Sequence, residues 1–334
     1  MEFRRSFTFI LFLYYVISLS QSYEVIRDVG FLENECDQIL SKSVYVNINS
    51  RKIIKVTTCL QNFAATTLRD LGIFAGGSIN NHPSDVVTVY NFTSNSWHKI
   101  STLSSARTRL TATTLNNLAF FAGGSTDLAI SDTVDIYNVD SGNWTTTHLS
   151  SPRYSLSSTS LLNMVLFAGG YGLAGPSDVV DIYTRGQWHT AQLSQPRYSL
   201  SSTSVGDLAF FAGGITAMGP SDRIDIYNAR SDTWTTQALS IPRTTVAVTV
   251  VNEWVLFAGG CDSTLVEIFN IDTNDWDYIS LDKETYTVNA ITIETESGPM
   301  ALLLSESNIL TTFSSNEFYQ NKNSTTSTTG GKRL

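Results

Sequence analysis

Short apolar runs alternate with polar turns at a regular interval along most of the chain. Five of these runs end in the same four residues, Phe-Ala-Gly-Gly, and they begin at Phe74, Phe121, Phe167, Phe211 and Phe257. The spacings are 47, 46, 44 and 46 residues, and a period in this range is typical of stacked or radial repeat proteins. Continuous apolar runs of this length predict strands that are buried on both faces.

Each repeat predicts four strands. A run rich in Ser, Thr and Val precedes the Phe-Ala-Gly-Gly strand, and a β-branched stretch such as TVDIYN (133–138) follows it. That stretch ends on an aromatic, and a turn rich in Asn, Asp, Ser and Gly then leads to a tryptophan. The aromatics are Tyr90, Tyr137, Tyr183, Tyr227 and Phe269, and the tryptophans are Trp97, Trp144, Trp188, Trp234 and Trp276. Because helical periodicity is absent, we expect an all-β chain.

These features together resemble the kelch repeat. Four strands within a spacing of 44 to 47 residues fit one blade of a β-propeller. The glycine pair, the aromatic, the tryptophan about seven residues later and the Pro-Arg that opens the next repeat all match the kelch pattern. The resemblance covers residues 59–319 and implies a kelch-type β-propeller, in which we expect the aromatics to pack between blades.

The number of blades depends on the two ends of this region. Residues 286–318 have no glycine pair and no tryptophan, but MALLLS (300–305) and NILTTF (308–313) read as strands of a degenerate sixth repeat. The stretch VYVNINSRKIIKV (44–56) resembles a third and a fourth strand. A propeller joins its first and last blades to avoid open sheet edges. We therefore expect six four-stranded blades, with residues 23–58 supplying the closing strands. Seven blades, with the N-terminal strands forming part of an extra blade, is the alternative.

The two termini predict export and a disordered tail. Arg4 and Arg5 precede the apolar stretch 7–20, and small residues at a cleavage site follow it, so residues 1–22 read as a secretory signal peptide. An uncleaved anchor is the rival, but about 14 apolar residues are short for a bilayer that needs roughly 20. No second stretch approaches that length, so we expect a secreted protein without a membrane span after cleavage. Residues 320–334 are polar, of low complexity and predicted to be disordered.

Export would bring the cysteines into an oxidising compartment and three sequons to the glycosylation machinery. In an oxidising compartment Cys36 and Cys59 are the candidates for a disulfide, which leaves Cys261 as a buried free thiol. The sequons begin at Asn91, Asn143 and Asn323. No spacing of Cys or His predicts a zinc site, and we expect no metal and no cofactor.

Four repeats carry an arginine and an acid at fixed places. The arginines lie 14 residues before the Phe of Phe-Ala-Gly-Gly, and the acids lie in the third strand, so the pairs are Arg107 and Asp135, Arg153 and Asp181, Arg197 and Asp225, and Arg243 and Glu267. The first repeat has Leu60 and Thr88 instead, and the last has no arginine and has Thr311. Because the two residue types are present or absent together, we infer an ion pair within each blade, with the arginine lying across the bare glycine pair. Solvated, unpaired arginines and a ring that binds an anion are the alternatives.

The repeat also separates two faces. Loops that follow the glycine pair emerge with the Pro-Arg loops on one face, here named the Gly-Gly face, and the aromatic-to-Trp turns emerge on the other, here named the turn face. Asn91 and Asn143 lie on the turn face. The resemblance to kelch proteins implies that peptide partners bind the free Gly-Gly face. The candidates there are residues that vary between repeats: Tyr154, Tyr198, Tyr171, Arg109, His82, Asp127 and Asp262. Exposed Tyr and Arg are favoured at interface hot spots.

The sequence therefore favours a secreted module that binds a protein or a glycan. The formal net charge of −9 argues against nucleic acid. A structural or matrix spacer is the second reading: a spacer predicts repeat-like residues all round, whereas a binding module predicts a contiguous patch of non-repeated residues. Resemblance to a family indicates the fold but does not by itself determine the function.

An enzyme is not expected. Some kelch-like propellers are copper radical oxidases, sugar epimerases or iron-dependent specifier proteins, and the copper site needs two histidines and two tyrosines. Of the histidines, His98, His148 and His189 follow a tryptophan on the predicted outer strand, and only His82 lies on the Gly-Gly face. No Ser-His-Asp set can form. Paired carboxylates for glycoside chemistry stay open, but no catalytic residue is assigned.

Overall fold

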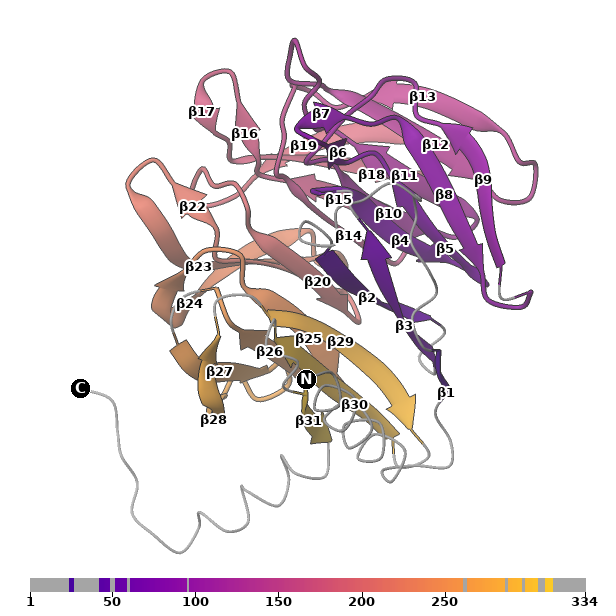
Figure 1. Cartoon of the computed structure of the whole chain (residues 1–334). Helices are drawn as coiled ribbons and strands as arrows, with labels where there is room; N and C mark the ends of the chain where they lie inside the picture. The colour runs from indigo at the N-terminus through magenta and orange to yellow at the C-terminus, as the bar shows by residue number, and fades with distance from the viewer. Residues whose placement is uncertain are drawn as a thin grey trace, which may run out of the picture.

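The computed structural model describes residues 24–26, 42–48, 52–58, 61–94, 96–260, 263–285, 288–295, 298–305 and 310–314. The regular elements in these ranges are β-strands (Figure 1). The predicted signal peptide, the predicted tail, the three cysteines, Asp262 and Asn323 lie outside the described residues. The described residues include no helix with the length and apolar character needed to cross a lipid bilayer.

Five antiparallel sheets follow one another along the chain, and each is built from one repeat. The first sheet contains β4 (Ala64–Leu68), β5 (Leu71–Ala75), β8 (Val86–Asn91) and β9 (Ser96–Thr102). The second contains β10 (Thr111–Leu115), β11 (Leu118–Ala122), β12 (Thr133–Asn138) and β13 (Trp144–His148). The third contains β14 (Ser157–Leu161), β15 (Met164–Ala168), β18 (Val179–Thr184) and β19 (Gln187–Gln192). The fourth contains β20 (Ser201–Val205), β21 (Leu208–Ala212), β23 (Gly219–Asn228) and β24 (Thr233–Arg243), and the fifth contains β25 (Ala247–Val251), β26 (Trp254–Ala258), β27 (Ser263–Asn270) and β28 (Trp276–Thr285).

Short hairpins extend the loops that follow the glycine pairs. Strand β6 (Ser78–Ile79) pairs with β7 (His82–Pro83), β16 (Tyr171–Gly172) pairs with β17 (Gly175–Pro176), and β22 (Ile215–Thr216) pairs with the start of β23. Figure 1 shows the β16–β17 and β22 hairpins projecting from one end of the sheets. The Gly-Gly face is therefore formed by projecting loops rather than by a flat sheet surface.

The core lies between neighbouring sheets. In the second strand of each repeat the Phe-Ala residues are almost fully buried, as the continuous apolar runs predict. Tyr137 and Trp144 of the second sheet pack against a cluster that contains Ile73 and Val89 of the first. Tyr183 and Trp188 pack in the same way against the second sheet. The aromatics therefore pack between sheets, where large rings bury much apolar area.

Hydroxyl groups join the first strands of neighbouring sheets. Ser157 Oγ lies 2.7 Å from Ser202 Oγ, and Ser204 Oγ donates to Ser160 O over 2.7 Å. These serines belong to PRYSLSSTS, a string that occurs twice, at 152–160 and at 196–204. Small hydroxyl side chains thus allow the first strands to approach closely while their polar atoms stay paired.

The two ends of the repeat region form sheets of three strands. One contains β29 (Val288–Thr295), β30 (Gly298–Ser305) and β31 (Leu310–Ser314). The other has the order β1-β3-β2, with β1 (Glu24–Ile26), β2 (Lys42–Ile48) and β3 (Lys52–Thr58). The sequence predicted that N-terminal strands would complete the last sheet, but in the described residues they pair with one another instead. The reason is local: only three residues separate β2 from β3, and the two strands pair along their whole length.

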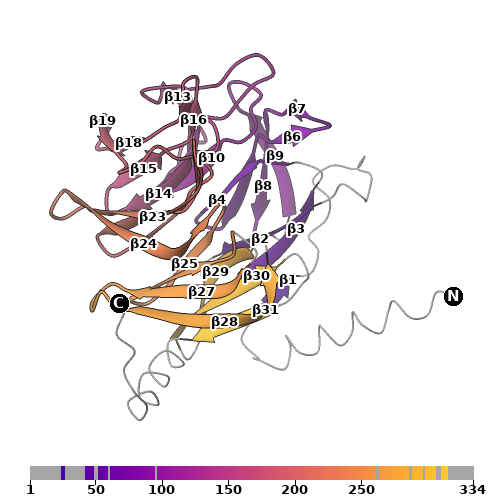
Figure 2. The ribbon, with the colours of Figure 1, turned by 90° about the vertical axis from the view of Figure 1, so that its left-hand side faces the viewer.

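The N-terminal sheet lies between the last sheet and the first. Strand β2 contacts both β29 and β4, just as the first strands of the repeats contact their neighbours in turn. Figures 1 and 2 show the indigo strands of this sheet beside the yellow strands of the last one. The fold is all-β, made mostly of antiparallel four-stranded sheets, and has the architecture of a β-propeller.

Candidate functional site

The structure brings each repeated arginine into contact with the acid of its own sheet. Arg107, Arg153 and Arg197 place Nη2 against Asp135, Asp181 and Asp225, and Arg243 Nη2 lies 3.0 Å from Glu267 Oε1. All four arginines are at most 1% exposed. They are therefore neither solvated nor available as a ring that binds anions.

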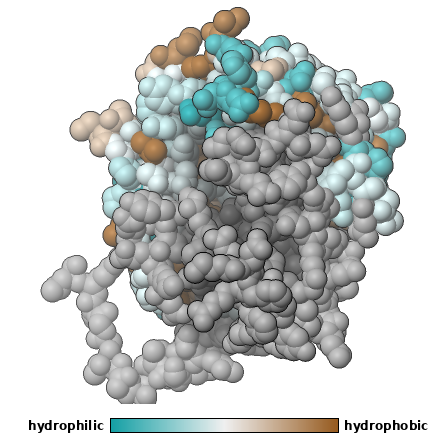
Figure 3. All heavy atoms as spheres, viewed as in Figure 1, coloured by the Kyte–Doolittle hydropathy of each residue, from teal (hydrophilic) through white to brown (hydrophobic). Residues whose placement is uncertain are grey.

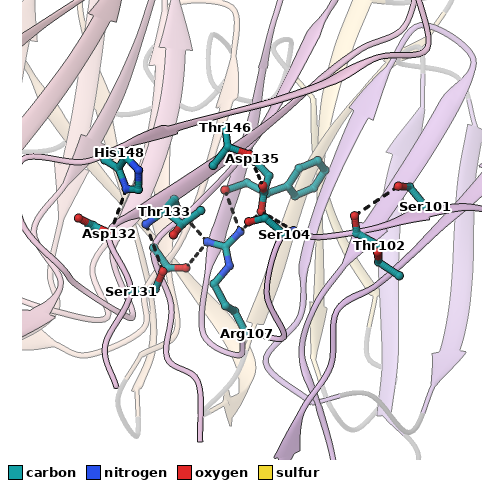
Figure 4. A network of polar contacts seen from close by, with 12 residues as sticks. Ser101, Thr102, Ser104, Arg107, Ser131, Asp132, Thr133, Asp135, Thr146 and His148 are labelled. Atoms are coloured by element: carbon teal, nitrogen blue, oxygen red, sulfur yellow. Dashed lines mark hydrogen bonds and ion pairs between the residues drawn. The ribbon is translucent and has the colours of Figure 1, made fainter. Parts of the chain in front are cut away.

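Backbone groups complete the environment of the arginine. Arg107 Nη1 donates to Gly123 O and Thr133 O over 2.7 and 2.8 Å (Figure 4). Asp135 also accepts the backbone N–H of Ser104, in the segment that enters the sheet, and the hydroxyl of Thr146. The ion pair thus ties the entering segment to the second, third and fourth strands of one sheet.

Burial works against the charge on these arginines. It lowers the pKa of the Arg107, Arg153 and Arg197 guanidinium groups, and the paired aspartate opposes that shift. The Nε–H of all four buried arginines has no hydrogen-bond partner among the described residues. The pairing is therefore incomplete on one side, so the remaining bonds matter more for keeping the charge buried.

The glycine pair contacts the arginine of its own sheet and also the backbone of the next sheet. A Cβ atom on Gly123 would lie 2.4 Å from Arg153 O of the next sheet, and one on Gly124 would lie 2.7 Å from Thr108 O. Both glycines have positive φ, and Gly124 N–H donates to Arg153 O over 2.9 Å. The bare Gly123 thus admits the backbone of the next sheet. In the third repeat a Cβ atom on Gly170 would also lie 3.2 Å from Cβ of Arg153, the arginine of its own sheet.

Four of the predicted interface residues lie together on the Gly-Gly face. The Tyr154 and Tyr171 ring centroids are 5.4 Å apart, and the Tyr171 and Tyr198 centroids are 5.1 Å apart. Arg109 Cζ lies 5.5 Å from the Tyr154 centroid. The three tyrosines, named here the tyrosine row, are half-buried, and Arg109 is exposed at its end. The row crosses from the second sheet to the fourth.

Four equivalent residues in the loops before the first strands have positive φ. Asn62, Arg109, Ser155 and Ser199 occupy equivalent places and all have φ between 51 and 56°. Each of the last three donates its N–H to the carbonyl of the preceding one over 2.9 Å. The equivalent residue of the fifth repeat is Thr245, whose β-branched side chain disfavours a positive φ. Non-glycine residues in this conformation cost free energy and often mark functional sites.

The remaining candidates divide into two groups. His82 Nδ1 lies 3.8 Å from Asp127 Oδ1, which links the loops of the first and second sheets, and both side chains are exposed. Asp262 lies outside the described residues. On the turn face, Asn143 is exposed, whereas Asn91 Oδ1 accepts the backbone N–H groups of Thr93 and Ser94.

Sequence reasoning missed three apolar residues on the Gly-Gly face. Leu128, Leu173 and Met218 are 97%, 87% and 96% exposed. They lie three or four residues after the glycine pairs of the second, third and fourth sheets, which are the sheets that the tyrosine row crosses. Figure 3 shows apolar atoms at the surface along the upper and left edges of this view. The signal was present as a large apolar residue three or four positions after each of these glycine pairs.

The described residues offer no constellation for metal chemistry. They contain no group of three or more His, Cys, Asp or Glu that could hold an ion. The nearest polar partner of His148 is Asp132, and that of His98 is Ser96. Both histidines are thus engaged by polar partners on the outer strands β13 and β9.

Comparison with known proteins extends only to the fold. No protein-family model and no curated protein sequence matches the chain. Among solved structures, that of YjhT, a kelch-like β-propeller protein, resembles it with a TM-score of 0.58 and 13% sequence identity. The match covers 76% of this chain and 97% of that one. At this identity the likeness concerns architecture, and it places the chain among proteins with a β-propeller fold.

Proposed function

We propose that this chain is a secreted kelch-type β-propeller that binds a protein or a glycan through its Gly-Gly face. The observation that carries the proposal is the tyrosine row with Arg109. Equivalent positions in other repeats hold Gln61, Thr108, Ser78 and Ser125. Tyrosine occurs at the place of Tyr154 only in the third and fourth repeats, so the contiguous patch is confined to neighbouring repeats, whereas a spacer would repeat the same residues around the molecule.

The exposed apolar loops favour a protein over a glycan. Leu128, Leu173 and Met218 expose nearly their whole side chains on the same face. Scattered apolar residues are normal on a surface, but here three neighbouring loops each carry one, three or four residues after the glycine pair. Burial of such side chains stabilises protein contacts, and tyrosine and arginine supply the hot spots.

The binding test compares tyrosines on two faces. The double variant Tyr154→Ala, Tyr198→Ala is expected to lose at least tenfold in affinity for the partner, because hot-spot truncations cost about 2 kcal/mol or more. Proximity labelling identifies candidates, glycan arrays test sugars, and purified pairs give the Kd. The matched control is Tyr278→Ala, which removes a tyrosine that is 43% exposed on β28. Equal affinity of the double variant and the wild type would reject the Gly-Gly face as the site.

We further propose that the propeller has seven blades, with the N-terminal sheet as the seventh. The contacts of β2 with β29 and β4 support this arrangement, because they continue the series of neighbouring first strands. The alternative of six blades requires the N-terminal strands to pair with β31.

Deletion of residues 23–58 tests whether the N-terminal strands close the propeller. Without the N-terminal sheet the flanks of the first and last sheets are open, so we expect Tm to fall by at least about 5 °C. Calorimetry of the secreted variant measures this. A variant without residues 320–334 is the control and is expected to keep its Tm. An unchanged Tm after the first deletion contradicts closure by the N-terminal strands, whether they complete a sixth blade or form a seventh.

A further inference from the structure

A hollow of about 450 Å³ lies on the turn face, at the third sheet. It is lined by Leu162, Met164, Arg185, Gln187 and His189 of that sheet and by Ala229 of the fourth. The proposed Gly-Gly face lies at the opposite ends of the strands. The hollow therefore belongs to a different part of the molecule from the tyrosine row.

The hollow coincides with a departure from the repeat. The aromatic and the tryptophan are seven residues apart in four repeats, but Tyr183 and Trp188 are only five apart. The same two-residue difference appears in the Phe-Ala-Gly-Gly spacing of 44, between Phe167 and Phe211, where neighbouring spacings are 46. The third sheet thus has a shorter turn between its outer two strands.

The longer turns place an apolar residue at the corresponding position in the other repeats. An asparagine ends the third strand, and its Oδ1 accepts two backbone N–H groups of the turn, as Asn228 does. The next residue donates its N–H to the neighbouring turn, and its apolar side chain packs inward. These next residues are Phe92, Val139, Ala229 and Ile271.

The third sheet has Arg185 at the position where the other repeats have this apolar residue. Thr184 stands in the place of the asparagine, and its hydroxyl donates to Asn163 O over 3.2 Å. Arg185 follows it with a φ of 50°, and Gly186 has a φ of 81°, which makes a tight two-residue hairpin turn. Arg185 is exposed and forms no ion pair with any described residue. A free guanidinium therefore stands where the other repeats place an inward-facing apolar side chain or a small residue.

The charge of the lining is unusual for this chain. The formal net charge of the protein is −9, yet the hollow is lined by Arg185 and His189 and by no carboxylate. Leu162, Met164 and Ala229 supply apolar surface beside the two basic groups. A volume within about 300–1,000 Å³ suits a small molecule. We propose that this hollow binds a small organic anion that has one carboxylate and an apolar part.

Titration with phenylacetate, followed by NMR of the histidine side chains, tests the proposal. We expect phenylacetate to shift the His189 resonances and the neutral amide phenylacetamide not to shift them. Arg185→Asn is expected to weaken binding about tenfold, because it removes a charge-assisted hydrogen bond. Asparagine before Gly186 suits the left-handed turn, so the variant keeps its fold.

Two further variants give the controls. Arg230→Asn removes an exposed arginine from the equivalent turn of the fourth sheet, where it bonds to Asp207, and is expected to leave binding unchanged. Replacing residues 184–187 with NARSDT, the sequence of residues 228–233, gives the third sheet the longer turn with its asparagine and apolar residue. This variant is expected to abolish binding. Glucuronate and inorganic phosphate distinguish the source of the anion.

The outcomes separate clearly. Tighter binding of phenylacetate than of glucuronate would support an apolar part beside the carboxylate, whereas tighter binding of glucuronate, a polar sugar acid, would overturn that part of the proposal. Equal shifts with phenylacetamide, equal binding of phosphate, or no effect of Arg185→Asn would overturn it. Because the tyrosine row is not involved, failure here leaves the proposed function untouched.

Discussion

Replacement of Arg153 by alanine is expected to lower the free energy of unfolding by about 3–5 kcal/mol, because it leaves a buried carboxylate without its cation. Arg153 and Asp181 are each 1% exposed, so the carboxylate is removed from bulk water. The carbonyls of Gly169 and Val179 also lose a donor. Chemical denaturation of the variant and the wild type measures the difference.

A double-mutant cycle isolates the pair. Asp181→Ala removes the acceptor for both Arg153 and the Ser150 N–H, and the double variant is expected to be more stable than the sum of the single effects implies. Arg230→Ala is the surface control: Arg230 pairs with Asp207 but is 81% exposed, so its loss is expected to cost below about 1 kcal/mol. Additive effects of Arg153→Ala and Asp181→Ala would show that the two residues stabilise the sheet independently.

The ion pairs could be predicted because the repeats of this one chain can be compared with one another. Arginine and acid occur together in four repeats, and the first repeat has Leu60 and Thr88 in their places. Internal repetition therefore carries information that a single unrepeated domain would lack. Strand order and the burial of the Phe-Ala strands were predictable for the same reason, since five copies display one pattern.

Features without a second copy were harder to predict. The N-terminal strands read as parts of the last sheet, but pairing is decided by which strands meet first, and β2 and β3 are adjacent in the chain. The tyrosine row needed the register between neighbouring sheets, which local patterns do not contain. The shortened turn before Trp188 was visible in the spacing, yet its consequence depends on a space between sheets that only the structure defines.

The glycine pair has a second structural contact that the sequence did not indicate. Its structural role follows from the sequence, because no helix follows it to bind a phosphate. The contact that excludes a side chain comes from the next sheet: Arg153 O faces Gly123 and accepts the N–H of Gly124. One backbone carbonyl thus joins two sheets, while the side chain of the same arginine secures its own sheet. Glycine and arginine together form the junction between repeats.

Gly123→Ala is therefore expected to lower the free energy of unfolding by about 2–5 kcal/mol. A φ of 68° costs alanine about 1–2 kcal/mol, and a Cβ atom 2.4 Å from Arg153 O forces the sheets apart at a further cost of about 1–3 kcal/mol. Gly142→Ala is the matched control, since Gly142 has a φ of 71° and would place its Cβ atom in open space. The control is expected to show the backbone cost alone, measured by the same denaturation. Equal losses in the two variants would mean that close approach of the next sheet contributes nothing, and that left-handed geometry alone requires the glycine.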